Sequence, residues 1–556
     1  MDAPSPERPW SRFWPSHVPN SMEYPAHPAW WIMFRNLPSY AERPAIRFLD
    51  PEEVEEQQVL TYAELAHSCK RLAVGLLRAG IHPGDRVAFF LPNCPALIIS
   101  YYGTWLAGAI AVPCNPMNKV AELGYQLLDS GSSLLITSGS LYPLTEEVAR
   151  PLGIPVFVAP ADTGAEEGLP AGAQPLTDLG GDPEGFTPPH LQPERDLALL
   201  LYTGGTTGLP KGAMLSHRNI VANTLQFATW YSFEEGGETC ISTLPLFHSG
   251  GMAGAMNVPL YSAATLLLFP RFRPAGVMKA IERYKATRFF GVPAMYSAVL
   301  NLPDCRKYNL SSLRACRTSA APLPAATKSQ FDSLAGREIL VEGYGLTETS
   351  PLAIANPIGR AKKGSIGIPL PDTDTRILDL TTGQAALPGQ EGELVLRGPQ
   401  VMLGYWQRPE ETAAAFAGGW FHTGDIAQTD EDGYLYIVDR MKDMINTAGY
   451  KVWPREVEEV LYQHPAVQRA AVVGVQDSYR GETVKAFLVL KDSAAGIMTA
   501  DEITNFCRER LAAYKVPRHV EFCRELPTSG AGKVLKRVLR EGEQHQGSDG
   551  SNLRKS

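Results

Sequence analysis

Short apolar runs alternate with longer helix-like stretches through most of the first 400 residues of the chain. One connecting stretch, Ala96–Leu106, has Asn93 in the position of a helix cap and Pro95 in the first turn. The apolar runs, rich in Val, Ile, Leu or Phe, are Arg86–Leu91, Ala109–Val112, Leu134–Thr137, Leu197–Tyr202, Thr265–Phe269 and Ile339–Val341. This alternation predicts βαβ units whose sheets are buried.

From Arg376 onward the pattern changes to shorter hairpins. The turn Asp430–Gly433 lies between two extended segments, Gly424–Ala427 and Tyr434–Val438. After Arg440, roughly 100 residues form a plausible small domain. Its predicted elements follow a polar segment and are a helix Pro454–Gln463, strands Ala470–Val475 and Thr483–Leu490, a helix Asp501–Leu511 and a short strand Val520–Phe522.

The predicted fold class is therefore α/β. A large N-terminal domain (1–439) of stacked α/β sheets with a β-rich subdomain precedes a small α+β domain (440–540). The last residues, 541–556, are polar and contain glycine, which predicts a flexible tail.

Composition excludes several classes of protein. Lys and Arg total 51 and Asp and Glu total 59, so the net charge of -8 offers no basic field for nucleic acid. Eight cysteines without any C-x-x-C pair disfavour structural zinc and fit free thiols in a reducing cytoplasm. Residues 1–16 lack the apolar core of a secretory signal, and the uncharged stretches 95–114 and 239–270 are too interrupted by polar residues, Gly and Pro to predict transmembrane spans.

The strongest local signal is a strand that runs into a glycine- and threonine-rich loop, LLYTGGTTGLPKG at residues 200–212. Glycines let backbone N–H groups converge on an anion, threonine hydroxyls add donors, and an ammonium group neutralises charge. The loop is not a Walker A motif, because Leu209 and Pro210 separate Gly208 from Lys211. The predicted phosphate-binding residues are Thr203, Gly204, Gly205, Thr206, Thr207, Gly208 and Lys211.

This loop resembles the signature of the adenylate-forming superfamily, which comprises acyl-CoA synthetases, peptide-synthetase adenylation domains and luciferases. Further signatures follow in the family's order: SAAPL at 319–323, GYGLTET at 343–349, GEL at 392–394, GYW at 404–406, WFHTGD at 420–425, DR at 439–440 and GAGK at 530–533. They span residues 200–540, and the family's length accounts for nearly the whole chain.

The GYGLTE segment suits a nucleotide, because a tyrosine can stack on a purine while Thr and Glu address a phosphate and its Mg²⁺. The resemblance implies that Tyr344 lies beside adenine, Thr347 on the α-phosphate and Glu348 towards magnesium. It places Asp425 on the ribose, where a carboxylate can accept two hydrogen bonds from a vicinal diol. The other nucleotide-binding residues that it implies are Ala320, Ala321, Pro322, Gly343, Gly345, Ile437 and Arg440.

The resemblance also implies two half-reactions and a mobile C-terminal domain. Lys533 resembles the lysine that closes over the carboxylate and α-phosphate during adenylation, where a point charge stabilises developing negative charge. Lys442 occupies the family's hinge. The implied catalytic residues are thus Lys533, Thr347, Glu348 and Lys211.

In the second half-reaction a thiol attacks the acyl-adenylate, and water must be kept away from that mixed anhydride. The resemblance places Ala448, Gly449 and Lys451 at the thiol channel, with Lys451 offering charge to the CoA phosphates. It implies ATP, Mg²⁺ and CoA as cofactor and co-substrates.

The sequence departs from the family's pattern at three places. Gly204 stands where many members have Ser, which removes one hydroxyl donor from the phosphate loop. Ser319 and Ala320 replace a common Gly-Gly pair, and Ala448 replaces Gly or Ser. The first two changes keep side chains small, so nucleotide binding is expected to survive, while the CoA contact at Ala448 is less firmly indicated.

The acyl pocket is predicted to be lined by Phe247, His248, Gly250, Gly251, Met252 and Met295. No Arg or Lys occurs from Glu238 to Pro270, so this wall offers little to a second charge on the acid, and its glycines leave room for an apolar group. Two interpretations of His248 are open: it lies beside the carboxylate of the substrate acid, or it is a packed core residue. By resemblance, the C-terminal motifs are closest to those of bacterial medium- and long-chain fatty-acid-CoA ligases.

The function predicted is ATP-dependent conversion of a fatty acid to acyl-AMP and pyrophosphate, followed by transfer to CoA with release of AMP. The alternatives are an aryl or short-branched acid CoA ligase, an acyl-AMP ligase that loads a carrier protein, and a catalytically silent nucleotide- or acyl-binding protein. The hypothesis of a catalytically silent protein predicts that Lys211, Glu348, Asp425 or Lys533 is lost. All four residues are present. The expected partners are the small-molecule acid, ATP and CoA, and no nucleic acid is expected. The predicted location is the cytoplasm. Peripheral contact with a membrane and a homodimer are both left open.

Overall fold

The computed structural model describes residues 8–159, 169–203, 209–447, 450–477, 480–491, 497–528 and 534–541. Its internal contacts divide the chain into two compact units, Met1–Asp374 with Leu396–Phe421, and Thr375–Val395 with His422–Ser556. Both units combine strands and helices, which confirms the predicted α/β class. The functional boundary at residues 439–440 stays a prediction, and the predicted tail lies, except for residue 541, outside the described residues.

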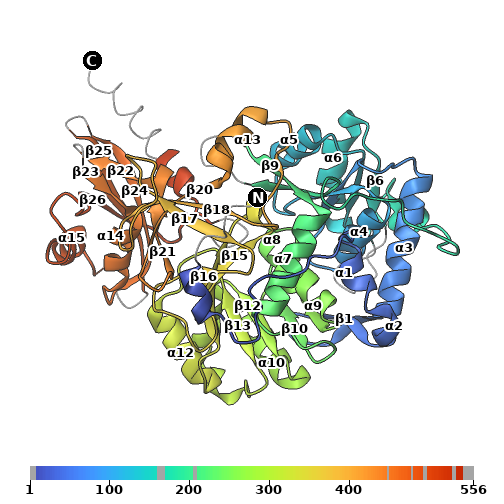
Figure 1. Cartoon of the computed structure of the whole chain (residues 1–556), viewed down its shortest axis with the longest axis horizontal. Helices are drawn as coiled ribbons and strands as arrows, with labels where there is room; N and C mark the ends of the chain where they lie inside the picture. The colour runs from blue at the N-terminus through green and yellow to red at the C-terminus, as the bar shows by residue number, and fades with distance from the viewer. Residues whose placement is uncertain are drawn as a thin grey trace. The chain divides into compact units, whose positions relative to one another are not determined.

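The first unit contains a nine-stranded sheet (Figure 1). Its strands in spatial order are β16 (Ile368–Pro369), β15 (Leu352–Ala355), β14 (Leu340–Gly345), β13 (Ala315–Thr318), β12 (Arg288–Gly291), β10 (Thr239–Ser242), β11 (Thr265–Leu268), β1 (Pro44–Leu49) and β2 (Glu56–Thr61). The central strands are parallel, and antiparallel pairs close the two edges. Because parallel strands need crossovers, helices cover this sheet.

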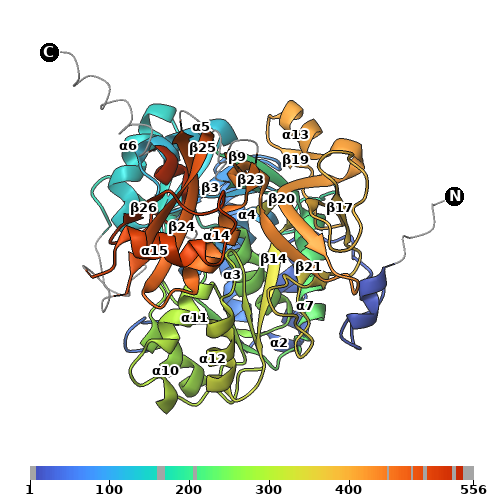
Figure 2. The same cartoon turned by 90° about the vertical axis from the view of Figure 1, so that its left-hand side faces the viewer.

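Three of these helices lie together on one face (Figure 2): α10 (Pro274–Tyr284), α11 (Pro293–Leu300) and α12 (Ala325–Ala335). They bury Ile281, Tyr296 and Phe331 against strand residues such as Cys316 and Leu340. The opposite face of the sheet carries α7 (His217–Trp230), whose Phe227 ring is stacked on Phe290 of β12.

An eight-stranded sheet forms the other layer of the first unit. Its order is β19 (Gly404–Tyr405), β9 (Lys211–Ser216), β8 (Leu197–Thr203), β4 (Ile110–Pro113), β3 (Arg86–Phe90), β5 (Leu134–Thr137), β6 (Val156–Val158) and β7 (Gln174–Pro175). The helices α5 (Val120–Ser130) and α6 (Tyr142–Leu152) pack their apolar residues on this sheet. The predicted apolar runs thus become the central strands β3, β4, β5 and β8 of this sheet and the strands β11 and β14 of the nine-stranded sheet.

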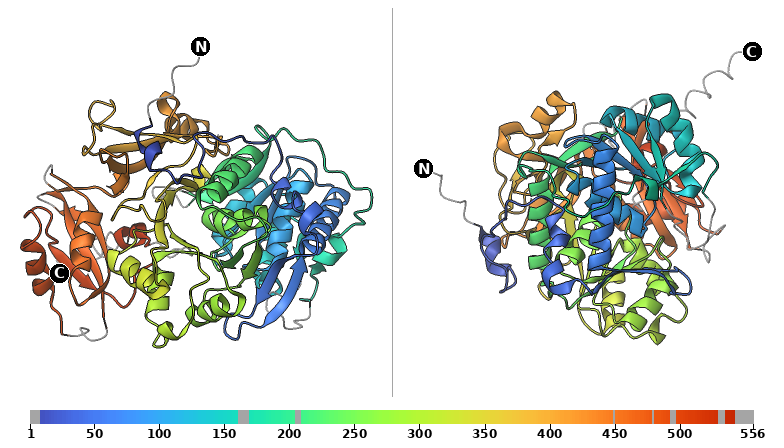
Figure 3. Two further views of the ribbon diagram at one scale, coloured as in Figure 1. Left: turned by 60° about the horizontal axis from the view of Figure 1, so that its bottom comes forward. Right: turned by 90° about the vertical axis from the view of Figure 1, so that its right-hand side faces the viewer.

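The helices α3 (Tyr62–Arg78) and α4 (Pro95–Leu106), blue in Figures 1 and 3, pack closely. A side chain at Gly103 would come within 2.8 Å of the Leu72 side chain, so glycine permits this approach. The predicted cap of α4 is wrong by one residue, because Cys94 is the N-cap. The Asn93 amide instead donates to Leu244 O (2.9 Å) and accepts from Leu246 N (2.8 Å), which fixes a loop that reappears in the site below.

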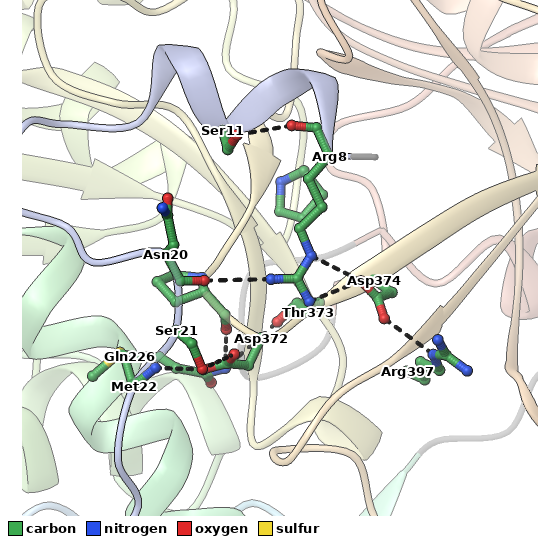
Figure 4. A network of polar contacts seen from close by, with 12 residues as sticks. Arg8, Ser11, Asn20, Ser21, Met22, Gln226, Asp372, Thr373, Asp374 and Arg397 are labelled. Carbon is green, nitrogen blue, oxygen red and sulfur yellow. Dashed lines mark hydrogen bonds and ion pairs between the residues drawn. The ribbon is translucent and has the colours of Figure 1, made fainter. Parts of the chain in front are cut away.

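The N-terminal segment is held to the same unit by two aspartates (Figure 4). Asp372 accepts hydrogen bonds from Ser21 Oγ, Met22 N and Tyr24 OH at 2.8, 2.9 and 2.8 Å. Asp374 lies 3.0 Å from Arg8 and 3.1 Å from Arg397. The remaining short helices of the unit are η1 (Pro9–Phe13), α1 (Trp31–Phe34), α2 (Leu37–Tyr40), η2 (Gly139–Leu141), η3 (Leu176–Leu179), α8 (Ser249–Met252), η4 (Ala253–Asn257), α9 (Val258–Tyr261), η5 (Cys305–Lys307), η6 (Thr347–Thr349), α13 (Pro409–Ala415) and η7 (Ala417–Gly419).

The second unit, drawn in orange and red in Figure 1, contains two smaller sheets. One has the order β17 (Asp374–Leu378), β18 (Gly392–Arg397), β20 (Phe421–Thr429) and β21 (Leu435–Arg440). The other has β23 (Tyr450–Val452), β22 (Ile445–Thr447), β25 (Gly481–Leu490) and β24 (Val467–Asp477), with β26 (His519–Phe522) beside β25. The short helix η8 (Met441–Asp443) precedes β22.

Two helices, α14 (Pro454–Tyr462) and α15 (Ala500–Arg508), share a core with the second of these sheets. The predicted helices and longer strands after Arg440 are present with ends shifted by a few residues. The strands β22 and β23 fall in the segment that the sequence analysis described only as polar, because three residues are too few to show a period.

His217 is a buried titratable group at the start of α7. Ser216 caps this helix, and the ring Nδ1 of His217 accepts a hydrogen bond from Ala29 N at 3.0 Å. Burial lowers the pKa of His217 to about 3, from 6.5 in an exposed histidine. The folded protein therefore holds this imidazole neutral.

The pH dependence of stability follows from that lowered pKa. The unfolded chain takes up a proton at His217 below about pH 6.5 and the folded chain does not, so the free energy of unfolding falls as the pH drops from that value towards 3. His217→Asn keeps an acceptor for Ala29 N and cannot titrate. We expect it to reduce the pH slope by about 1.4 kcal/mol per pH unit below pH 6, measured by urea titration between pH 7 and pH 4.5. An unaltered slope would contradict a neutral buried His217.

Candidate active site

Four neighbouring parallel strands, β10, β12, β13 and β14, end at one edge of the nine-stranded sheet. In open α/β sheets, ligands bind beyond the carboxyl ends of the strands. The segments that follow the ends of β10, β12 and β13 contain the predicted acyl wall (246–252 and 292–295) and the predicted adenine edge (319–322), and the GYGLTE motif (343–348) begins in the last three residues of β14. The fold thus brings these three groups of predicted residues, which are far apart in sequence, to one edge of the sheet.

The phosphate loop is the connection of the β8–β9 hairpin. Thr203 and Lys211 are direct partners across this hairpin, so the two ends of the loop are fixed at the same level. Tyr202 OH donates to Asp129 at 2.7 Å, and Tyr125 OH donates to Pro210 O at 2.9 Å. Residues 204–208, which carry the predicted Gly and Thr donors, lie outside the described residues.

Lys211 faces a tyrosine that the sequence analysis gave no role of its own. The strand β19 pairs with β9, with Tyr405 opposite Ala213. The ammonium of Lys211 lies 5.3 Å from the centre of the Tyr405 ring and 4.0 Å from Glu411 Oε1. The GYW motif at 404–406 marked the position, but only the strand pairing shows the contact.

The end of β14 is built to place Thr347 and Glu348. A side chain at Gly345 would lie 1.7 Å from Pro351 O, so only glycine fits there. The short helix η6 follows, and Leu346 N donates to Thr349 Oγ1 at 2.9 Å. Local hydrogen bonds therefore fix the turn that presents Thr347 and Glu348.

Glu348 connects this turn to β19. Tyr405 OH donates to Glu348 Oε1 at 2.9 Å, and Met402 N donates to the Glu348 carbonyl at 2.8 Å. Burial raises the pKa of Tyr405, and the adjacent Glu348 carboxylate raises it further. Lys211, Tyr405 and Glu348 thus form a row from the hairpin to the GYGLTE motif, and we refer to it as the Lys211–Glu348 row.

The Glu348 carboxylate and the Thr347 hydroxyl are hard oxygen donors, the kind that Mg²⁺ uses together with substrate phosphates. The described residues include no group of three or more His, Cys, Asp or Glu that could hold a metal ion without a substrate. The donor set therefore fits a magnesium ion that arrives with a nucleotide, and does not provide a protein-only cage.

The replacement of a common glycine by Ala320 at the predicted adenine edge affects the backbone conformation there. Ala320, where a glycine is common in the family, has φ of 72°. This left-handed conformation costs an L-residue roughly 1–2 kcal/mol relative to glycine. The predicted adenine edge therefore carries backbone strain at Ala320.

Ala320→Gly is expected to raise the free energy of unfolding by about 0.5–1 kcal/mol, the relief of strain less the entropy of an added glycine. Ala321→Gly is the matched control, because Ala321 is not among the described residues with positive φ. Chemical denaturation of both variants tests this: stabilisation by both, or by neither, would contradict strain at Ala320.

The acyl wall begins with a firmly held loop. Asn93 holds residues 244–246 as described above, and a side chain at Gly251 would lie 2.0 Å from Pro245 O. Gly250, in contrast, has no atom within 4 Å of the position of a side chain. Burial lowers the pKa of His248 to about 4, so this imidazole is neutral at pH 7 and packs beside Phe247 with ring centres 4.7 Å apart. Met252 is buried, and a side chain at Gly291 would lie 3.3 Å from the Met295 sulfur.

In the second unit, Asp425 and Arg440 face each other across β20 and β21. Arg440 Nε lies 3.3 Å from Asp425 Oδ1, and Asp425 N donates to Thr423 Oγ1 at 3.1 Å. Ile437 pairs with Ala427 on the same two strands. The carboxylate of Asp425 is therefore held in an orientation fixed by its own unit.

Other predicted residues of the second unit have less structural support. Lys442 lies in η8, between Asp439, which accepts from Arg455 N at 2.7 Å, and Asp443, which accepts from Arg540 at 3.0 Å. Lys451 lies exposed in β23. The side chain of Lys442, together with Ala448, Gly449 and Lys533, lies outside what the structure describes.

The sequence pattern common to AMP-binding enzymes matches residues 33–406. The chain belongs to this family. The C-terminal domain of AMP-binding enzymes also matches, at residues 456–533. The predicted family and reaction class, an AMP-forming acid-thiol ligase, are thereby confirmed.

Relatives match along nearly the whole chain. A long-chain-fatty-acid–CoA ligase of Bacillus subtilis (strain 168) is 41% identical over 97% of this chain and 98% of its own length. A feruloyl-CoA synthase of an Amycolatopsis species is also 41% identical, over 86% of this chain and 93% of its own length. The relatives of this family therefore include enzymes named for two different kinds of acid.

Solved structures agree with the fold. ATP-bound MatB from Rhodopseudomonas palustris has a TM-score of 0.83 at 31% identity and covers 93% of this chain and 99% of its own. The anthranilate CoA ligase AuaEII in complex with anthranoyl-AMP has a TM-score of 0.82 at 30% identity, covering 96% and 99%. Among the described residues, no helix of this family member is both long and apolar enough to cross a membrane.

Proposed function

We propose that the enzyme activates a medium- or long-chain fatty acid with ATP and transfers the acyl group to CoA. The observation that carries this proposal is the Lys211–Glu348 row, which connects the ends of the phosphate loop to the GYGLTE turn within one unit. The names of several relatives, long-chain-fatty-acid–CoA ligases, support a fatty acid as the substrate.

In the first half-reaction a carboxylate oxygen of the acid attacks the α-phosphorus of ATP, and the bond to pyrophosphate breaks. The donors around Thr203 and Lys211 bind the phosphates, and Thr347 holds the α-phosphate. Fixed donors and charges that meet the developing negative charge stabilise the transition state without reorganisation. Tyr344 and Asp425 orient the nucleoside, through the purine ring and the ribose hydroxyls.

Glu348 would hold the magnesium ion, with Thr347 beside it. When bound, the ion neutralises phosphate charge. The Lys211–Glu348 row also orients Glu348 itself, because Tyr405 OH donates a hydrogen bond to one oxygen of the Glu348 carboxylate.

In the second half-reaction the CoA thiol attacks the acyl carbonyl, loses its proton, and AMP leaves with the oxygen that joined it to the acid. We propose that the C-terminal part rotates about Lys442 between the two steps, and that Gly449 and Lys451 lie at the thiol channel afterwards. Burial of the intermediate protects the mixed anhydride from water. Cytoplasmic location, a homodimer and peripheral membrane contact stay predictions from the sequence.

An aryl acid is the second candidate substrate, because a feruloyl-CoA synthase has the same 41% identity to this chain as the fatty-acid ligase, although over 86% of the chain and not 97%. Both candidates share the adenylation chemistry and differ only in the acyl pocket. Chain length in a fatty-acid pocket would be set by depth, since each buried CH₂ contributes about 0.8 kcal/mol.

A screen of pyrophosphate release separates these candidates. Purified enzyme is given ATP, magnesium and acids of graded length, together with benzoate and ferulate, with and without CoA. We expect pyrophosphate release with aliphatic acids and CoA-dependent formation of AMP in excess over enzyme. Release only with aryl acids would favour the second candidate, and release that does not respond to CoA would contradict the ligase.

A further inference from the structure

Arg317 is a buried arginine on the face of β13 opposite the α10–α12 helices. Side chains alternate along a strand, and its neighbour Cys316 lies in the core under those helices. Arg317 points the other way, with its guanidinium 4.8 Å from the centre of the Phe227 ring of α7. Only 3% of Arg317 is exposed.

The guanidinium of Arg317 is only partly satisfied. Its Nη2 donates to Ser319 Oγ at 2.9 Å, while Nε and Nη1 have no acceptor among the described residues. No carboxylate of the described chain forms an ion pair with it. Arg288, one strand away, is buried as well and its Nε also has no acceptor among the described residues, but its charge is paired with Glu238 and its Nη1 donates to Tyr231 O at 3.0 Å.

Tyr231, at the end of α7, has a second unsatisfied polar group in the same place. Its hydroxyl is buried without a partner among the described residues, and the residue is 2% exposed. Arg317 and Tyr231 both lie against the Phe227 ring, and the charge of Arg317 opposes the rise that burial causes in the pKa of Tyr231. The rings of Phe227 and Phe290 lie 5.3 and 5.9 Å from the Tyr231 ring and enclose the pair in apolar surface.

This pair adjoins the proposed acyl wall. The Phe227 and Phe290 rings lie 3.0 and 3.6 Å from a side-chain position at Gly254, in the helix that continues directly from Ser249–Met252. Ser319, which Arg317 contacts, directly precedes Ala320 of the predicted adenine edge. Arg317 and Tyr231 therefore lie behind the wall that receives the acyl group.

A buried charged donor without an acceptor is costly. A buried polar group without a partner destabilises the folded protein, and a charged group does so more than a neutral one. A ligand that brings an oxygen acceptor recovers that cost, and an anionic oxygen recovers the most. A purely aliphatic chain would leave the donors as they are.

We propose that Arg317 and Tyr231 recognise an oxygen on the acid that is remote from the activated carboxylate, so that the preferred substrates are acids with a second carboxylate or a distal hydroxyl. The inference deepens the proposed function and rests on it. Arg317 supplies a positive charge, which the segment 238–270 lacks because it contains no Arg or Lys.

The test compares matched acids on the whole enzyme. For each chain length from hexanoate to tetradecanoate, kcat/KM for CoA-dependent AMP formation is measured with the plain acid, its ω-hydroxy form and its ω-carboxy form. We expect the best oxygenated acid to exceed its plain counterpart by about 10-fold or more, and Arg317→Met to lower that ratio by about 10²-fold, as for a site built to hydrogen-bond its substrate. Arg314→Met, the same change at an exposed arginine next to β13, is the matched control and should leave the ratio unchanged.

A second variant and a stability measurement distinguish recognition of the substrate by Arg317 from a purely structural role of this residue. Tyr231→Phe removes only a hydroxyl and should lower the ratio by about 3- to 10-fold. Arg317→Met should keep or raise the melting temperature, because it removes an unpaired buried charge. A lowered melting temperature with an unchanged ratio, or a wild-type enzyme that prefers the plain acid at every length, would overturn the inference while leaving the proposed function intact. No CoA-dependent turnover with any acid would overturn the proposed function, and the inference with it.

Discussion

Lys533→Ala is expected to slow adenylation by a factor on the order of 10² or more, while transfer of the acyl group from pre-made acyl-AMP to CoA stays nearly intact. The reason is that a charge acting on the transition state of one half-reaction does not contribute to the other. Pyrophosphate release in the absence of CoA measures the first step. Thioester formation from synthetic acyl-AMP measures the second.

The matched control for this prediction is Lys491→Ala, since Lys491 is another lysine of the second unit and is exposed. It should leave both steps near the wild-type rates. A Lys533→Ala enzyme in which both steps fall together would show that the division of roles between two domain states is wrong. A variant that adenylates normally would remove Lys533 from the catalytic residues.

Lys442→Pro is expected to slow thioester formation by about 10-fold or more and adenylation much less. Proline fixes φ near −65° and removes the backbone donor, so a hinge at this position loses the second of its two conformations. Asp443, just after this position, accepts a hydrogen bond from Arg540, whereas Asp439, before it, accepts one from Arg455 N, so a rotation about Lys442 keeps the first bond and has to break the second.

Lys442→Ala separates the hinge from the charge. It removes the same side chain and keeps the backbone free, so we expect both half-reactions to proceed close to wild type. Equal slowing by alanine and proline would assign the effect to the ammonium group, and unchanged transfer in the proline variant would remove the hinge proposal.

Much of the fold could be predicted from the sequence because it depends on local patterns. The strands β3, β5 and β8 are dense apolar runs, and the hairpin connection that follows β8 carries the glycine- and threonine-rich motif. The candidate site residues Lys211, Tyr344, Thr347 and Glu348 could be predicted because they lie in motifs with a fixed spacing. Local patterns of this kind are visible without any knowledge of distant contacts.

The rest depends on contacts between distant segments. Tyr405 acquires its place beside Lys211 and Glu348 only through the pairing of β19 with β9. Asn93 looked like a cap, and its amide is used instead by a loop about 150 residues further along the chain. Arg317 is informative because no carboxylate of the described residues reaches it, which is a property of the packed core and not of the neighbouring sequence.

The central claim is that the acid attacks the α-phosphorus of ATP and that CoA then displaces AMP. It is tested most directly with an acid whose carboxylate oxygens carry a heavy-oxygen label, incubated with enzyme, ATP, magnesium and CoA. The account predicts that the phosphate of AMP gains a single labelled oxygen for each acyl-CoA formed, as read by mass spectrometry. Unlabelled AMP, or label found in inorganic phosphate, would contradict it.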